Sequence, residues 1–144
     1  MPVINQSEQV PYTAEEMYAL VDKFEDYPSF LPWCERSWVV SRSDHVTRAG
    51  MAVRKGKIHY SFVTDNTGEP PGRITIELAD GPFRHLRGSW TFAPNALGCR
   101  VTLSLDFEFE SRLVGAVLSP VFKVMTGSLV SSFRQRAASV YGRR

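Results

Sequence analysis

Residues 111–141 read SRLVGAVLSPVFKVMTGSLVSSFRQRAASVY, and this stretch decides the fold. Apolar residues recur in it at steps of three and four, which places them on one face of a helix. They are Leu113, Val117, Val121, Val124, Met125, Leu129, Phe133, Ala137 and Val140. At about 1.5 Å per residue the helix would run roughly 45 Å. A helix of that length must cross most of a single domain.

Pro120 disturbs this helical pattern. Proline has no amide hydrogen, and its ring clashes with the carbonyl group four residues earlier. Ser119 followed by Pro120 also fits a helix start, because serine is favoured at the N-cap and proline at the first helical position. Two alternatives remain open: a short helix followed by a main one, or one helix kinked near Pro120. Small residues on the same stretch fit either close packing against a sheet or room for a ligand. They are Gly115, Ala116, Gly127, Ser128, Ser131 and Ser132.

Length and composition are those of one soluble globular domain. The chain has 144 residues, of which 43% are hydrophobic and 22% charged. A net charge of +2 neither requires nor excludes a nucleic-acid partner. Cys34 and Cys99 are far apart, which is typical of reduced thiols in a cytoplasmic protein. We expect no signal peptide, and the longest apolar run is too interrupted for the about 20 residues that a bilayer span needs.

The chain before residue 111 predicts a strand, a short helical region and six more strands. Residues 3–10 form the first strand, and Thr13 with Glu16 has the spacing of a capping box that starts a helix ending near Phe24. Residues 26–34 (DYPSFLPWC) predict a turn, a short helix and a turn. From residue 36 the apolar period is two, as in strands. These strands lie around Trp38 and at 46–55, 57–66, 74–78, 86–92 and 99–109, with a loop at 66–72 and turns at 43–45, 80–82 and 94–98.

Short turns between consecutive strands predict an antiparallel sheet. The last strand alternates most clearly, with apolar residues from Cys99 to Phe109 on one face and polar residues on the other. One face of the sheet should therefore be covered and the other wet. The long terminal helix is the natural cover, and a strongly twisted sheet would curl around it. Such an arrangement can leave an apolar space between helix and sheet.

Five phrases carry a family resemblance, in the family's order and over nearly the whole chain. They are residues 10–21 (VPYTAEEMYALV), 27–34 (YPSFLPWC), 80–92 (DGPFRHLRGSWTF), 105–113 (LDFEFESRL) and 121–141 (VFKVMTGSLVSSFRQRAASVY). The chain resembles the START-like, helix-grip superfamily, and within it the branch of coenzyme-Q-binding proteins and bacterial ribosome-association toxins. The resemblance implies a single START-like domain over residues 1–144. Its fold would be α+β: a curved seven-stranded antiparallel sheet wrapped around a long C-terminal helix, with one or two short helices after the first strand.

The resemblance implies three alternative functions. The leading one is binding of a hydrophobic molecule, ubiquinone or another lipid, in support of respiration. The second is a toxin that binds the large ribosomal subunit and inhibits translation initiation. The third is a cyclase-type enzyme. The partners expected are thus a lipophilic small molecule or the large ribosomal subunit, with no covalent cofactor. The expected location is the cytoplasm, with peripheral contact to the inner membrane as a further expectation.

A ligand cavity is expected where aromatic residues on inner strand faces meet the small residues of the long helix. Residues 27–34 are expected to cover it, because their apolar side chains need burial. The candidate cavity residues are Met17, Tyr27, Phe30, Leu31, Trp33, Tyr60, Phe62, Trp90, Phe92, Phe107, Phe109, Val117, Val121, Val124, Met125 and Leu129.

The pattern of polar residues does not indicate a catalytic site. Asp106, Glu108 and Glu110 alternate on the outer face of the last strand, where water solvates them. The three histidines lack metal-ligand spacing, and no nucleophile motif or phosphate loop is present. We therefore predict no catalytic residue, no metal and no enzyme.

Basic residues on the strands are candidates for contacts with ribosomal RNA. Arg84, Arg87 and Arg100 would act through phosphates and give salt-sensitive binding if the fold brought them together. The alternative is charge that merely alternates on a wet sheet face.

Overall fold

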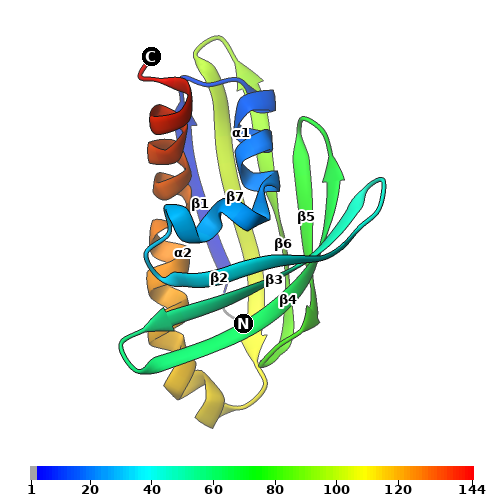
Figure 1. The fold of residues 1–144 in the computed structure, drawn as a ribbon, viewed down its shortest axis with the longest axis vertical. Coiled ribbons are helices and arrows are strands. Elements are labelled where there is room, and N and C mark those ends of the chain that lie inside the picture. Colours follow the sequence, from blue (N-terminus) through cyan, green and yellow to red (C-terminus); the bar gives the residue numbers. More distant parts are fainter. Residues whose placement is uncertain (1–2) are drawn as a thin grey trace.

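The computed structural model describes residues 3–144 as a curved sheet that holds a long helix (Figure 1). The sheet has seven antiparallel strands in the order β1-β7-β6-β5-β4-β3-β2, so only β1 returns to pair with the last strand. The predicted fold is confirmed. The elements are β1 (Val3–Val10), α1 (Ala14–Asp22), the 3-10 helix η1 (Phe24–Ser29), β2 (Cys34–Arg42), β3 (Val46–Lys55), β4 (Ile58–Glu69), β5 (Arg73–Asp80), β6 (Phe83–Asn95), β7 (Gly98–Phe109) and α2 (Arg112–Tyr141).

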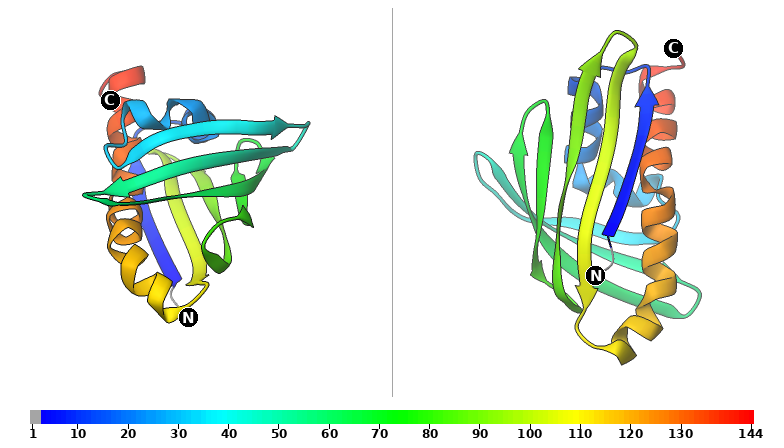
Figure 2. Two further views of the ribbon diagram at one scale, coloured as in Figure 1. Left: turned by 60° about the horizontal axis from the view of Figure 1, so that its bottom comes forward. Right: turned by 180° about the vertical axis from the view of Figure 1, so that it is seen from behind.

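The sheet curves because its two halves run in different directions. Figure 2 shows β1, β7 and β6 running roughly along α2, whereas β2, β3 and β4 cross it. Helix α1 and η1 lie over the upper part of the concave side. The space between helix and sheet is therefore bounded by α2, by both halves of the sheet and by η1.

Alternating side chains on β7 build much of the core. Its inward residues Cys99, Val101, Leu103 and Leu105 are buried, while the residues between them are more exposed. The helix contributes buried residues at steps of three and four, as expected of one face that packs on a sheet. They are Val121, Phe122, Met125, Thr126, Leu129, Val130, Phe133 and Ala137.

Helix α2 is continuous through Pro120, so the alternative of two separate helices is wrong. Ser111 is its N-cap, with the Ser111 hydroxyl accepting a hydrogen bond from the Val114 amide at 3.1 Å. Pro120 lies inside the helix, where it cannot donate to the carbonyl four residues earlier. Figure 2 shows the first turns of α2 running in a different direction from the rest of the helix. The helix therefore absorbs the proline as a bend.

Two predicted loops are shorter in the structure. Residues 66–69 continue β4 to Glu69, because Asn66 pairs with Ile76 of β5 and Gly68 with Ile74. Strand β6 likewise runs through Pro94 to Asn95, in register with Gly98 of β7. Turn-forming residues misled the prediction in both places, since cross-strand pairing overrides local preference.

The start of α1 is fixed by the predicted capping box. The Thr13 hydroxyl accepts from the Glu16 amide at 3.1 Å, and the Glu16 carboxylate accepts from the Thr13 amide at 3.0 Å. The guanidinium of Arg144 also donates to that carboxylate, at 2.6 and 2.8 Å. The bonds from Arg144 and Thr13 together lower the pKa of Glu16 from 4.5 to about 2.

We predict that Glu16→Gln flattens the acid branch of the stability curve. A depressed folded-state pKa contributes stability above pH 4.5, which is lost as the pH falls toward 2. The wild type should therefore lose stability more steeply than Glu16→Gln over this interval, as measured by urea unfolding at a series of pH values. Glu15→Gln, at an exposed neighbouring position, is the control and should follow the wild type. Parallel curves for wild type and Glu16→Gln would contradict the prediction.

Candidate ligand cavity

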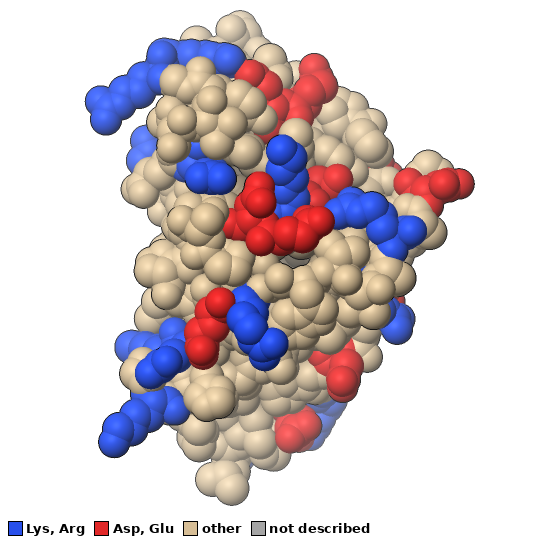
Figure 3. Space-filling view, viewed as in Figure 1, with Lys and Arg blue, Asp and Glu red and all other residues tan. Residues whose placement is uncertain are grey.

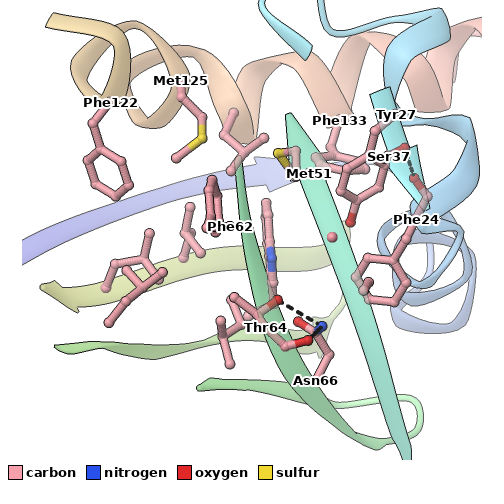
Figure 4. Close-up of a pocket in the computed structure, with 18 residues that line it drawn as sticks. Phe24, Tyr27, Ser37, Met51, Phe62, Thr64, Asn66, Phe122, Met125 and Phe133 are labelled. Carbon is pink, nitrogen blue, oxygen red and sulfur yellow. Dashed lines mark hydrogen bonds between the residues drawn. The ribbon is translucent and has the colours of Figure 1, made fainter. Parts of the chain in front are cut away.

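An apolar cavity of about 80 Å³ lies between α2 and the concave face of the sheet (Figure 4). Helix α2 provides one wall, strands β5, β6 and β7 the floor, β2 to β4 the crossing wall, and η1 one end. The lining residues are Phe24, Tyr27, Ser37, Ala49, Gly50, Met51, Phe62, Thr64, Asn66, Ile76, Leu86, Trp90, Leu103, Leu105, Phe122, Met125, Leu129 and Phe133. Most of these side chains are apolar, so the cavity suits hydrocarbon better than water.

Polar groups in the lining have internal hydrogen-bond partners. The Asn66 side-chain amide donates to the Thr47 carbonyl at 3.1 Å and to the Thr64 hydroxyl at 3.0 Å. The Ser37 hydroxyl donates to the Phe24 carbonyl at 2.5 Å. These bonds hold β2, β3, β4 and η1 together at the edge of the cavity. Their first role is therefore to satisfy buried polar groups.

Residues 27–34, the expected lid, lie at one end of the cavity, and Tyr27 is the residue among them that lines it. Tyr27 and Trp33 are buried, and Leu31 is fully buried. The Tyr27 hydroxyl donates to the Val21 carbonyl at 2.5 Å, and the Trp33 indole donates to the Ser128 hydroxyl of α2 at 3.1 Å. The small residue Ser128 thus anchors the lid to the helix.

The Tyr60 hydroxyl is a buried polar group without a partner among the described residues. Tyr60 precedes Phe62 by two residues on β4, so the two side chains share a face, and their ring centroids are 6.0 Å apart. The ring of Phe83 lies 6.3 Å away. Burial among these rings raises the pKa of Tyr60. The hydroxyl is therefore a neutral donor held in an apolar setting next to the cavity.

Five of the sixteen candidate cavity residues line the cavity: Tyr27, Phe62, Trp90, Met125 and Leu129. Another group is buried in the surrounding core without reaching the cavity: Met17, Leu31, Trp33, Phe92, Phe107 and Val121. Three are half-buried at its margin: Phe30, Tyr60 and Phe109.

Val117 and Val124 do not face the sheet. Their exposed fractions are 47% and 37%. The bend at Pro120 turns the first part of α2 away from the sheet, and Val124 lies at the edge of the buried stripe that Val121 and Met125 define. The helical repeat alone was therefore not enough to predict which way the Val117 and Val124 side chains face.

Several other lining residues were not predicted as cavity residues. Ala49 and Ser37 come from strands that the sheet's curvature brings over α2, which no local pattern shows. Asn66 and Thr64 lie on β4 near a segment that was predicted as a loop. Phe133 belongs to the apolar pattern predicted for residues 111–141 and Phe122 does not, but both side chains reach the cavity from α2.

The three candidate RNA contacts do not form one cluster. Arg84 donates to Glu108 at 3.3 Å, and Arg87 lies opposite Asp106. Arg100 lies toward the other end of the strands, opposite Ala93, and donates to the Ser7 hydroxyl at 2.8 Å. This face therefore carries mixed charge.

The acidic row on β7 is part of the same mixed surface. His85 lies 3.0 Å from Asp106 and 3.9 Å from Glu108. Within residues 3–144, no group of three or more histidine, cysteine, aspartate or glutamate side chains is arranged to hold a metal ion.

We predict that both thiols are protected in the native protein. Cys34 and Cys99 are buried and unpaired, and burial raises the pKa of each thiol to about 11. Little thiolate is present at neutral pH, so native alkylation should be slow, whereas denatured protein should take up two labels in mass spectrometry. Rapid native labelling, or a monomer that takes up no label after denaturation, would contradict this.

The sheet, the gripped helix and the apolar cavity between them define a helix-grip protein of the START-like superfamily. Residues 10–134 match the family described as polyketide cyclase/dehydrase and lipid transport, and the chain belongs to this family.

Named relatives share the full length of the domain. The chain is 39% identical over 142 residues to the ribosome association toxin RatA of Pseudomonas aeruginosa, with 96% of this chain and 97% of the relative covered. It is 30% identical to the mitochondrial coenzyme Q-binding protein COQ10 homolog B of Xenopus laevis, covering 97% of this chain and 59% of that protein. A crystal structure of a Thermus thermophilus protein has the same fold, with a TM-score of 0.83 and 24% identity over 96% of this chain and 98% of the other.

Proposed function

We propose that the protein binds an apolar small molecule, a quinone or another lipid, in the cavity between α2 and the sheet. The observation that carries this proposal is the apolar lining of an internal space at the point where helix, sheet and lid meet. The family's description includes lipid transport, and the Xenopus relative is named for binding coenzyme Q, which supports a quinone as the first ligand to test.

The cavity must enlarge to hold such a ligand. Its volume of about 80 Å³ is smaller than the roughly 150 Å³ of an engineered apolar cavity that binds benzene. The lid is the wall proposed to move: Tyr27 and Phe30 pack on Phe133, and one side-chain hydrogen bond, from Trp33 to Ser128, joins the lid to α2. Outward movement of residues 27–34 would open the cavity while leaving the sheet in place.

The Tyr60 hydroxyl is the proposed contact for the polar end of the ligand. A quinone carbonyl accepts hydrogen bonds, and Tyr60 offers an unused donor beside the cavity wall at Phe62. An enlarged cavity that extends past Phe62 would reach this hydroxyl. Ligand binding would then satisfy a group whose burial now costs stability.

Tyr60→Phe should weaken quinone binding without lowering the stability of the fold. Removing an unpaired buried hydroxyl should leave the free energy of unfolding unchanged or raise it by about 1–3 kcal/mol, because the desolvation cost disappears. Quinone affinity should fall by roughly tenfold, since a hydrogen bond contributes about 1 kcal/mol or somewhat more. Thermal unfolding and ligand titration measure the two effects. A less stable variant with unchanged affinity would show that the hydroxyl is not a ligand contact.

Titration of the wild type with a short-chain ubiquinone analogue tests the function itself. Trp90 lines the cavity, so its fluorescence should be quenched by a bound quinone. A tail-free benzoquinone should bind more weakly, because the tail supplies most of the apolar area, at about 25 cal/mol per Å². No saturable quenching by the analogue would refute quinone binding in the cavity.

Ribosome association is the second candidate function. It is favoured by the RatA relatives, which match this chain over nearly their whole length. If it holds, the protein should sediment with large ribosomal subunits at low salt and be released as salt rises. Because Arg87 and Arg100 lie on the mixed face of β6 and β7, replacing both with glutamate tests that face. Absence of co-sedimentation at every salt concentration would eliminate this candidate.

A cyclase reaction has weaker support. It would need polar groups that converge on a substrate, and the Ser37 and Asn66 donors in the cavity already bond to the protein.

A further inference from the structure

The outward side of α2 is apolar over the first half of the helix. Its exposed positions there are Leu113, Ala116, Val117, Pro120 and Val124, which we call the docking face. The steps of three, one, three and four keep them on one side. Leu113 is 77% exposed, and Val117 and Val124 are 47% and 37% exposed. Such a run of exposed aliphatic side chains marks an interaction site more often than an ordinary surface.

The second half of the same helix shows the usual polar exterior. Arg134, Gln135 and Ser139 are exposed there, and Arg134 pairs with Glu8 at 2.8 Å. Helix α2 is long and apolar enough to cross a membrane, as the core helices of some folded domains also are. A core helix is mostly buried, however, and only 33% of the most apolar window of α2 is buried. The apolar exterior of the first half is therefore not explained by packing within the domain.

Basic residues border the docking face. Arg112 and Lys123 are about three turns apart on α2, so both lie along the same flank of the face. The turn between β3 and β4 adds Arg54, Lys55 and Lys57, all exposed. Figure 3 shows basic side chains gathered at the lower left, where Figure 1 places this turn beside the lower part of α2. We call these five residues the basic rim.

The basic rim is free to meet an external anion. Within residues 3–144, none of its five side chains forms an ion pair with a carboxylate. Other arginines are paired, including Arg42, Arg48 and Arg84. The five side chains of the basic rim therefore place positive charge beside the docking face with no carboxylate paired to it.

We propose that the docking face and its basic rim bind peripherally to an anionic lipid surface. An apolar helix face with lysine and arginine at its border is suited to lie in the interfacial plane, with the aliphatic residues below the headgroups and the cations among them. The opposite side of α2 remains in the domain, since Phe122, Met125 and Leu129 line the cavity. The helix therefore lies on the membrane and does not span it.

The charge and the apolar character of this surface favour an anionic lipid bilayer over other partners. A second copy of the chain, placed symmetrically on this face, would bring two basic rims together and be repelled. Nucleic acid would satisfy the cations but would leave Leu113 and Val117 without an apolar partner. An anionic bilayer matches both parts of the surface.

Docking would place the wall of the cavity next to the lipid phase. The first half of α2 separates the two, because the side chains at Phe122 and Met125 face inward while those at Val117 and Val124 face outward. The docking proposal does not rest on quinone binding, because vesicles without quinone test it. Failure of either proposal can therefore be recognised separately.

Flotation with vesicles tests the docking face. The wild type should float with vesicles of mixed phosphatidylcholine and phosphatidylglycerol, and much less with phosphatidylcholine alone. Leu113→Glu combined with Val117→Glu should lower the partition coefficient by about tenfold or more, because it puts carboxylates at the apolar contact. Val140→Glu is the matched control, since Val140 is 49% exposed at the polar end of the same helix. It should float like the wild type.

The basic rim is tested by Lys55→Glu combined with Lys57→Glu. Each lysine near an anionic surface strengthens binding roughly fivefold, so the double reversal should weaken it by more than about twentyfold. Arg143→Glu, at the other end of the molecule, should have little effect. Circular dichroism and thermal unfolding establish that the variants remain folded.

Three results would overturn the proposal. One is equal loss of flotation in Val140→Glu and in the Leu113/Val117 variant. Another is a wild type that fails to float with anionic vesicles at low salt. The third is a concentration-dependent dimer that the Leu113/Val117 variant dissociates, which would assign the face to a second copy.

Discussion

Phe133→Ala is expected to lower the free energy of unfolding by about 3–5 kcal/mol, the range for large-to-small changes in a packed core. Phe133 is fully buried in the second half of α2. Its ring centroid lies 5.4 Å from that of Tyr27, 5.2 Å from Phe30 and 5.3 Å from Trp90. One side chain thus joins the helix, the lid and β6. Urea unfolding monitored by circular dichroism measures the loss.

Phe30→Ala is the control for this prediction. Phe30 belongs to the same aromatic cluster but is only half-buried at the margin of the cavity. Its removal should cost less, because the lid can relax and water can replace the ring. Equal losses in both variants would mean that Phe133 has no special position in the core.

Ala49→Leu is expected to weaken ligand binding by at least about tenfold while leaving the fold stable. Ala49 is a buried residue of β3 whose small side chain lines the cavity. Three added carbon atoms would occupy existing space, and each buried methylene is worth about 0.8 kcal/mol. Stability should be unchanged or higher, and quinone affinity should fall by at least about tenfold, since ligand and leucine compete for one space.

Ala137→Leu provides the contrast for Ala49→Leu. Ala137 is fully buried on α2 and does not line the cavity. The same enlargement there is overpacking, which typically costs about 1–3 kcal/mol. Thermal unfolding and quinone titration of both variants give the comparison. If Ala49→Leu lost as much stability as Ala137→Leu and still bound ligand, the cavity would not be the binding site.

Local patterns predicted the elements of this fold because helix and strand have different repeats. The alternation from Cys99 to Phe109 identified β7 and its buried face, and the capping box identified the start of α1. Ser119 and Pro120 left two alternatives open, a new helix start or a kink within one helix, because the same residues fit both. Packing against the sheet keeps α2 continuous there.

The cavity was predicted less completely because it is a property of packing between distant segments. Trp90 and Leu129 were recognised because each lies on an inward face of its own element. Ala49 was not, because its small size matters only where the curved sheet brings β3 over α2. Sequence patterns therefore predicted where apolar faces lie, while the space left between them depends on how those faces meet.

The pairing of β1 with β7 has a consequence for how the chain folds during synthesis. Val3 lies opposite Asp106 and Val10 opposite Cys99, so the first strand made is hydrogen-bonded to the last strand made. On the ribosome, β1 must wait for its neighbour until β7 has emerged. Closing so long a loop costs entropy before the contacts between β1 and β7 form, and contacts between residues far apart in sequence slow folding. The nascent protein should therefore complete its sheet only after the last strand of the domain has left the ribosome.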